Sequence, residues 1–406
     1  MSALFSNGVI YMLSTLLGRG AIIFITIFTV NQMSSFESSE LVLYLSLFQL
    51  FLVFSVSGLA NIAIKRVVAA SQSLQQFSKV VTCLFMQAIV LSALVAVCYF
   101  FYFEYALERS NNRGFVAFCF SLSLVVQCLI LLVQSIFQGL GDFAEHFYVS
   151  IFLFACVAVS CLLFGDEVLN VAIFFLMSNF AALLFAGIVF LRKHKSVWDW
   201  EVSEFYSGIN ETLPIMLSSS VVPLCLAYGV GYFSIVASAE QSLFYNAAQQ
   251  WRGVISLVPA ALIQVMLPRL FLTRGGGQGA EVWVNMCVAI FFIIALVCGG
   301  GMTLVFFGLE ALYGETFSGA EPVFFVVIAA SALASVNSVM GTYFLVNASY
   351  KVMILVNLIW ALGYLLLLRF LLVENTAECF AIILLISYIV HAAVQGVFVR
   401  QLPHVR

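Results

Sequence analysis

The segment NGVIYMLSTLLGRGAIIFITIFTV, from Asn7 to Val30, contains one charged side chain, Arg19. A helix of this length, rising about 1.5 Å per residue, is long enough to cross the ~30 Å hydrocarbon core of a bilayer. Similar apolar runs recur along the 406 residues, which are 64% hydrophobic and only 9% charged. Soluble domains carry roughly 25% charged residues. The sequence therefore predicts an all-α polytopic membrane protein.

Hydropathy predicts about twelve transmembrane helices, in two sets of six separated by a polar segment. The first set is expected near residues 7–30, 41–61, 79–103, 114–138, 146–164 and 169–191. The second set is expected near 209–234, 242–267, 281–307, 320–346, 351–373 and 377–399. We therefore expect an N-terminal six-helix lobe (1–196), a cytoplasmic linker (197–208) and a C-terminal six-helix lobe (209–406). The aromatic side chains of the linker leave two interpretations open, a short helix on the membrane surface or a solvated loop.

Charge placement predicts the orientation, because short cytoplasmic loops retain lysine and arginine. One side of the predicted membrane holds only Arg109 and Arg113, whereas the other holds Lys65, Arg66, Lys79, Arg192, Lys193, Lys195, Arg269, Arg274, Lys351, Arg400 and Arg406. We expect the basic side, with both termini, to be cytoplasmic. The net charge of -3 gives no reason to expect nucleic acid as a partner. All ten cysteines lie in apolar segments without a Cys-x-x-Cys spacing, which favours small core residues over metal ligands or disulfides.

A weak internal repeat supports the two-lobe prediction. The end of the fourth span reads SIFQGLGDFAEHFYVSIF, from Ser135 to Phe152, and the end of the tenth reads TYFLVNASYKVMILVNLI, from Thr342 to Ile359. Each joins an apolar helix, a small-residue turn and another helix. Repeated lobes with a binding site between them are typical of secondary transporters.

Three arginines lie inside predicted spans, whereas all nineteen acidic residues fall in loops or at span ends. Arg369 is close enough to the outer interface to extend its charge into water. Arg19 lies about 18 Å from the start of its helix, and Arg252 about 25 Å from cytoplasmic Arg269. An arginine at such depth costs at least ~2.5 kcal/mol and usually marks a functional path. Without a buried acid, the two arginines favour an anionic ligand such as a phosphate or pyrophosphate.

Polar residues at helical spacing extend this candidate site. On the eighth span they form one stripe, and on the second span another stripe leads to the cytoplasmic mouth. Hydrogen bonding to neighbouring helices is the alternative interpretation for the uncharged members. His391 has no second ligand near it in the sequence, so a core histidine is favoured over a metal or proton-relay role. No catalytic or metal-binding residue is predicted, and the candidate substrate-binding residues are Arg19, Arg252, Gln249, Tyr245, Ser256, Gln49, Asn61 and Lys65.

The second half contains three stretches that resemble a known family. They read YNAAQQWRGVISLVPAALIQVMLPRL (Tyr245 to Leu270), LYGETFSGAEPVFFVVIAASAL (Leu312 to Leu333) and YFLVNASYKVMILVN (Tyr343 to Asn357). In the first half, QGLGDF (Gln138 to Phe143) agrees with them. The chain resembles the polysaccharide and O-antigen (Wzx-type) flippases. Their superfamily also contains the multidrug and toxic-compound extruders (MATE) and the lipid II flippases.

The resemblance implies two six-helix lobes around a central cavity, as in MATE proteins. It also implies alternating-access transport, without a cofactor or enzymatic step, of an undecaprenyl-pyrophosphate-linked oligosaccharide from the cytoplasmic to the periplasmic leaflet of the bacterial inner membrane. Arginines on the first and eighth helices of relatives contribute to a cationic cavity, a role that would fall to Arg19 and Arg252. Besides the lipid bilayer, other polysaccharide assembly proteins are candidate partners. The alternatives are a cation-coupled multidrug extruder, whose relatives use membrane-embedded acids, and a surface-polysaccharide polymerase.

Overall fold

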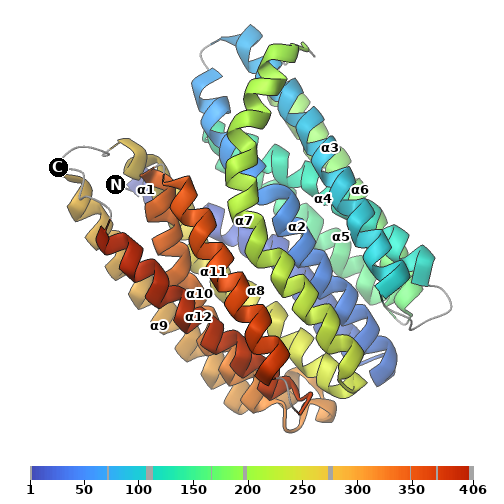
Figure 1. The fold of residues 1–406 in the computed structure, drawn as a ribbon. Helices are drawn as coiled ribbons and strands as arrows, with labels where there is room; N and C mark the ends of the chain where they lie inside the picture. The colour runs from blue at the N-terminus through green and yellow to red at the C-terminus, as the bar shows by residue number, and fades with distance from the viewer. Residues whose placement is uncertain are drawn as a thin grey trace. The chain divides into compact units, whose positions relative to one another are not determined.

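The computed structural model describes residues 2–70, 73–106, 113–165, 167–194, 199–272, 278–347, 349–371 and 374–401. Within these ranges the chain is all-helical, as expected, and contains no strand (Figure 1). Its elements are α1 (Ser2–Val30), α2 (Ser35–Ala70), α3 (Leu74–Ala106), α4 (Arg113–Leu140), α5 (Phe143–Phe164), α6 (Val168–Lys193), α7 (Val202–Val236), α8 (Ala239–Leu272), α9 (Gln278–Tyr313), the short 3-10 helix η1 (Glu315–Phe317), α10 (Glu321–Val346), α11 (Tyr350–Leu371) and α12 (Ala377–Gln401).

Eleven of the helices are long and apolar enough, over their described residues, to cross a membrane. Over the same described residues, α8 is not among these eleven. Several helices begin before the expected spans: α2 begins at Ser35 rather than near residue 41, and α7 at Val202 rather than near 209. Hydropathy detects the apolar part of a helix only, whereas the backbone hydrogen bonds continue into its polar flanks.

The chain divides into two compact units. The N unit is Gly20–Gly231, and the C unit combines Met1–Arg19 with Tyr232–Arg406. The boundaries fall inside α1 and α7, while the first turns of α7 include the last seven residues of the expected linker. The division into lobes 1–196 and 209–406 around a linker 197–208 follows chain order and stays a prediction.

In the N unit, α4 is the central helix and packs against α2, α3 and α6. Aromatic rings fill this core: the Tyr44 ring stacks on Phe103 and Phe120 at centroid distances of 4.1 and 5.5 Å. The hydroxyl of Tyr99 donates a hydrogen bond to the Tyr44 carbonyl oxygen over 2.9 Å. All four rings are buried, and buried aromatic rings supply a large part of core stability.

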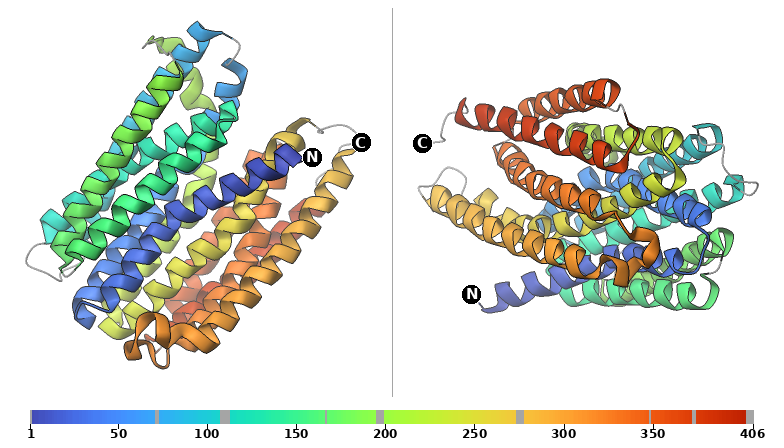
Figure 2. Two further views of the ribbon diagram at one scale, coloured as in Figure 1. Left: turned by 180° about the vertical axis from the view of Figure 1, so that it is seen from behind. Right: turned by 90° about the horizontal axis from the view of Figure 1, so that it is seen from below.

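In the C unit, α10 is central in the same way and packs against α8, α9 and α12. The pairings α2 with α3 and α5 with α6 likewise recur as α8 with α9 and α11 with α12. The helices α2, α3, α4, α5 and α6 therefore each have a counterpart six helices later with matching neighbours. Figure 2 shows the helices within each unit from two further directions. This correspondence agrees with the weak repeat in the sequence.

Two local features shape the N unit. A Cβ atom at Gly58 of α2 would lie 3.0 Å from the Met216 backbone, so glycine permits the close approach of α7. Gly141, with φ of 79°, makes the turn between α4 and α5 in a conformation that other residues rarely adopt. Pro214 and Pro223 lie inside α7 without ending it, and interior prolines usually bend a helix.

Candidate functional site

The position of the site depends on how two helices of the C unit, α8 and α12, are aligned along their length. The hydroxyl of Ser238 accepts a hydrogen bond from the Gln241 N–H and so caps the start of α8. The side chain of Gln241 accepts one from the Ala377 N–H, over 2.8 Å, at the start of α12. This contact ties the two helix starts together. Arg252 and Tyr388 each lie eleven residues further along their helices.

Arg252 is the centre of a hydrogen-bonded network at this level. Its Nη1 donates to the Tyr388 hydroxyl over 2.9 Å, and its Nε donates to the Gln249 side-chain oxygen. The Gln249 amide in turn donates to the Tyr245 hydroxyl. Tyr245, Gln249 and Tyr388 are buried, whereas Arg252 is half-buried.

The electrostatics of this network are unusual. Both described hydrogen-bond partners of Arg252 are neutral, and the described residues place no carboxylate in an ion pair with it. A guanidinium held among neutral groups in a membrane helix keeps its full charge and further N–H donors. Such a group can bind an anion with two oxygens through paired hydrogen bonds.

Side chains of α10 and α11 hold Tyr388 in place. The Asn337 side chain on α10 donates to the Tyr388 carbonyl oxygen over 3.3 Å. The Trp360 indole on α11 stacks on the Tyr388 ring, with centroids 5.6 Å apart, and on Tyr364, with centroids 5.3 Å apart. Four helices of the C unit therefore contribute to the position of one arginine. We call Tyr245, Gln249, Arg252 and Tyr388 the Arg252 network.

The structure thus brings together three of the eight candidate residues, Tyr245, Gln249 and Arg252. Ser256 is half-buried one turn further along α8. Gln49, Asn61 and Lys65 lie on α2 in the other unit, where Gln49 and Asn61 are half-buried and Lys65 is exposed. Arg19 lies on α1, but its side chain is outside the described residues.

Sequence reasoning pointed to polar residues on the tenth span, Asn337 among them, but missed the contributions of α11 and α12. A signal was present on α12, because Tyr388, His391 and Gln395 follow one another at steps of three and four residues. This is the same spacing that identified the stripe on α8. All three side chains are buried.

One acidic residue is buried near a helix end. Since α2 begins at Ser35 rather than near residue 41, Glu40 lies in its second turn, where it is 6% exposed. The N unit therefore does contain a buried acid within a long apolar helix. Among the described residues, no group of three or more histidine, cysteine, aspartate or glutamate side chains could hold a metal ion.

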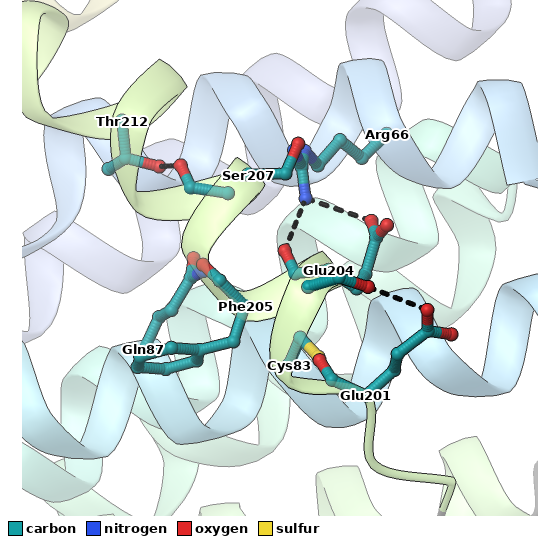
Figure 3. Close-up of polar contacts among 10 residues, drawn as sticks. Arg66, Cys83, Gln87, Glu201, Glu204, Phe205, Ser207 and Thr212 are labelled. Atoms are coloured by element: carbon teal, nitrogen blue, oxygen red, sulfur yellow. Dashed lines mark hydrogen bonds and ion pairs between the residues drawn. The ribbon is translucent and has the colours of Figure 1, made fainter.

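A second charged region lies in the N unit, at the start of α7 (Figure 3). Arg66 of α2 forms an ion pair with Glu204 over 2.9 Å and also donates to the Ser207 hydroxyl over 2.9 Å. From α3, Lys79 pairs with Glu201 over 2.7 Å, and Gln87 donates to the Phe205 carbonyl oxygen over 3.0 Å. These contacts, which we call the α7 clamp, fix the first turns of α7 to α2 and α3.

The clamp alters the ionisation of Glu201, which lies before the apolar part of α7. Hydrogen bonds from the Lys79 ammonium and then from the Ser203 hydroxyl, with the charge of Lys79, lower the pKa of Glu201 from 4.5. At neutral pH the carboxylate is therefore ionised and paired.

The other end of the connection from α6 is held in the same unit. Lys193 pairs with Asp142 over 2.7 Å and also with Glu145, both at the start of α5. The His194 ring contacts the second Asp142 oxygen over 2.8 Å. The polar segment between α6 and α7 is thus anchored at both described ends.

Comparison with known proteins establishes the fold. No family model matches the chain, and no curated protein matches it. An outward-facing multidrug resistance MATE family transporter of the MOP superfamily aligns with a TM-score of 0.74 at 12% identity, over 98% of this chain and 94% of that chain. The lipid II flippase MurJ, in an inward closed conformation, aligns with a TM-score of 0.72 at 12% identity, over 97% of this chain and 87% of that chain. An inward-facing MATE family transporter gives 0.71 at 9% identity, over 97% and 98%.

These similarities cover nearly the whole chain, so the protein has the MATE-like fold of the MOP transporters and flippases. It is a multi-pass membrane protein of that fold. At identities of this size, the similarity does not extend to substrate.

Proposed function

We propose that the protein is a flippase for undecaprenyl-pyrophosphate-linked oligosaccharide, such as an O-antigen repeat unit, in the bacterial inner membrane. It moves the lipid-linked unit from the cytoplasmic to the periplasmic leaflet by alternating access and makes or breaks no bond. The observation that carries the proposal is Arg252, a half-buried cation held by neutral partners within a membrane protein. A diphosphate supplies the two-oxygen anion that such an arginine binds.

Two further observations support a lipid-linked substrate. The sequence resembles the Wzx-type flippases along most of its length, and a flippase named for lipid II shares the fold. In this proposal the diphosphate binds the Arg252 network and Arg19. The sugar contacts uncharged polar residues, among them Ser256 of the C unit. Gln49 and Asn61 of the N unit stay candidate sugar-binding residues. Lys65 attracts the anion at the cytoplasmic mouth, and both chain termini lie in the cytoplasm.

A second candidate is a cation-coupled multidrug extruder. Two of the three similar structures named above are multidrug resistance MATE family transporters, and the buried Glu40 is the kind of acid on which cation coupling depends. The Arg252 network argues against an organic cation as the ligand, because like charges in a low-dielectric site repel strongly. A polysaccharide polymerase is a third candidate without a supporting structural observation.

The experiment that separates these candidates deletes the gene in its bacterial host. The leaflet that holds the lipid-linked repeat unit is then determined with a membrane-impermeant lectin or glycosidase. The flippase proposal expects repeat units to accumulate on the cytoplasmic face while surface polysaccharide is lost. Repeat units on the periplasmic face would support the polymerase. Unchanged lipid intermediates, together with increased sensitivity to toxic organic cations, would support the extruder.

A further inference from the structure

His391 of α12 is a buried histidine whose hydrogen-bonding capacity is unused. It is 4% exposed, and neither ring nitrogen has a hydrogen-bond partner among the described residues. A neutral imidazole carries one donor and one acceptor, and burial of both without partners is costly. Core histidines normally avoid this cost, so the side chain needs another explanation than packing.

Three neighbouring polar groups are in the same condition. The Trp360 indole N–H, the Gln395 side-chain oxygen and the Asn337 side-chain oxygen are all buried without a partner among the described residues. Gln395 lies one turn beyond His391 on α12, and Asn337 contacts the α12 backbone at Tyr388. The two amide oxygens are acceptors. Neither oxygen lies within hydrogen-bond distance of the His391 ring, but acceptors of this kind suit a protonated imidazole, which carries two N–H donors.

The Trp360 ring also favours a positive charge at this position. Its centroid lies 6.0 Å from that of the His391 ring, which is at the outer limit of about 6 Å for cation–π attraction. Trp360 stacks in addition on Tyr388, whose hydroxyl accepts the hydrogen bond from Arg252. The His391 cluster, which consists of Asn337, Trp360, His391 and Gln395, is thus connected with the Arg252 network through two aromatic rings.

The helices packed against α12 are α8, α10 and α11. At this level of α12, the titratable or charged side chains are Arg252 and Tyr245 on α8, Tyr364 on α11 and Tyr388 on α12 itself. Between Pro322 and Thr342, α10 carries no titratable residue. The charged residues at the described ends of α11 and α12 are exposed and are Lys351, Arg369, Glu378 and Arg400. Arg252 is therefore the charge to which a proton on His391 responds.

We propose that His391 is a proton-binding site that takes up a proton when an anion binds Arg252. The inference rests on the proposed diphosphate ligand and adds a proton as its co-ligand. Without an anion, the positive charge of Arg252 opposes a second cation in the same unit. A bound diphosphate removes this opposition, and by linkage a protonated His391 strengthens diphosphate binding by the same factor. The proton comes from solvent when the anion binds and returns to solvent when the anion leaves.

The test measures binding of a short-chain polyprenyl diphosphate sugar to the full-length protein in lipid nanodiscs. The diphosphate is substituted at both ends, so its own charge stays constant near neutral pH. For wild type, we expect the Kd to weaken by about tenfold between about pH 6 and pH 8, within the ~5- to 150-fold range of typical coupling. In His391→Gln, the change should fall below about twofold. The matched control His146→Gln, a buried histidine of α5 in the N unit, should retain the full pH dependence.

A direct measurement accompanies the binding assay. The chain has only four histidines, so the His391 signal can be identified in a histidine-labelled NMR spectrum by its loss in His391→Gln or His391→Asn. The midpoint of its titration should rise when the ligand is added. A His391 signal unaffected by ligand overturns the inference, as does a pH dependence that survives in His391→Gln. Absence of diphosphate binding at any pH overturns the proposed function and the linkage together, whereas pH-independent binding overturns the linkage alone.

Discussion

Arg252 of α8 donates a hydrogen bond to the hydroxyl of Tyr388 on α12, over 2.9 Å. The two residues are far apart in sequence, but the contact between Gln241 and Ala377 sets their helices in register. Because Gln249 and Tyr388 are neutral, they fix the direction of the guanidinium without cancelling its charge. An arginine that is pre-oriented in this way loses less conformational entropy when it binds an anion.

Replacement of Arg252 tests the anion site. Arg252→Ala should abolish surface polysaccharide while the protein remains in the membrane at wild-type amounts. Arg252→Lys should restore part of the activity, because an ammonium keeps the charge but loses the paired donors. Arg369→Ala, which removes an exposed arginine of α11, is the matched control and should behave as wild type. Normal polysaccharide in Arg252→Ala would contradict the anion-site hypothesis.

Tyr388→Phe tests whether Tyr388 positions the arginine. A hydrogen bond to a charged group contributes about 1.5 kcal/mol or more, so diphosphate affinity should fall roughly tenfold. The same change in an Arg252→Lys background should have little further effect, since the fixed guanidinium is then absent. Tyr148→Phe, on an exposed tyrosine of α5, serves as the control. Equal losses from Tyr388→Phe in both backgrounds would indicate a purely structural role.

Much of the fold follows from hydropathy, because only helices satisfy every backbone group within the lipid. The α8 stripe was equally readable, since Tyr245, Gln249 and Arg252 share one helical face whatever the tertiary structure. Tyr388 could not be assigned to it, because no local pattern states which helix α8 packs against. In the sequence, Tyr388 and His391 of α12 resemble ordinary core residues. Only the structure shows that Tyr388 accepts a hydrogen bond from Arg252 and that the His391 ring has no partner among the described residues.

The start of α2 was missed for a different reason. Ser38, Ser39 and Glu40 are polar and therefore resembled a loop, yet each is buried inside the helix. Helix formation and burial are decided by packing as well as by apolar composition. The same applies to Glu201 and Glu204 in the expected linker, which are held by ion pairs that only tertiary structure reveals.

Gln241→Ala should remove a contact that holds α8 and α12 in register. The mutation leaves the Ala377 N–H at the start of α12 without its partner, and loss of such a capping contact costs about 1 kcal/mol. Thermal unfolding in detergent should therefore begin at a lower temperature, and diphosphate affinity should fall with it. Gln75→Ala, at an exposed position near the start of α3, should change neither quantity. A Gln241→Ala protein as stable as wild type would show that other contacts set the register.

The pair between Lys79 and Glu201 should give a pH-dependent contribution to stability. Since the folded-state pKa of Glu201 lies below 4.5, its pairing stabilises the fold above that pH and is lost as the pH falls through the folded value. The thermal midpoint of Lys79→Met should therefore lie below that of wild type at neutral pH, and the difference should shrink in acid below pH 4.5. Lys351→Met, which removes an exposed lysine, is the control. A difference that stays constant through the acid range would exclude Glu201 as its source.

Charge exchange in the α7 clamp tests whether the start of α7 must remain fixed to α2. Arg66→Glu places a second carboxylate opposite Glu204, at the position of the 2.9 Å ion pair. The repulsion should release the first turns of α7 from α2. Proteolysis near Glu201 should then increase, and export should slow because α7 no longer moves together with the rest of the N unit.

Glu204→Arg alone should have a similar effect, because it places a second cation opposite Arg66. The double variant restores an opposite-charge pair and should recover most of the protection, with a coupling energy of about 1 kcal/mol for this partly buried pair. The Arg66 side chain also bonds Ser207, so recovery should be incomplete. Additive losses in the double variant would show that the clamp acts through hydrogen bonds and packing, and that its charges are dispensable.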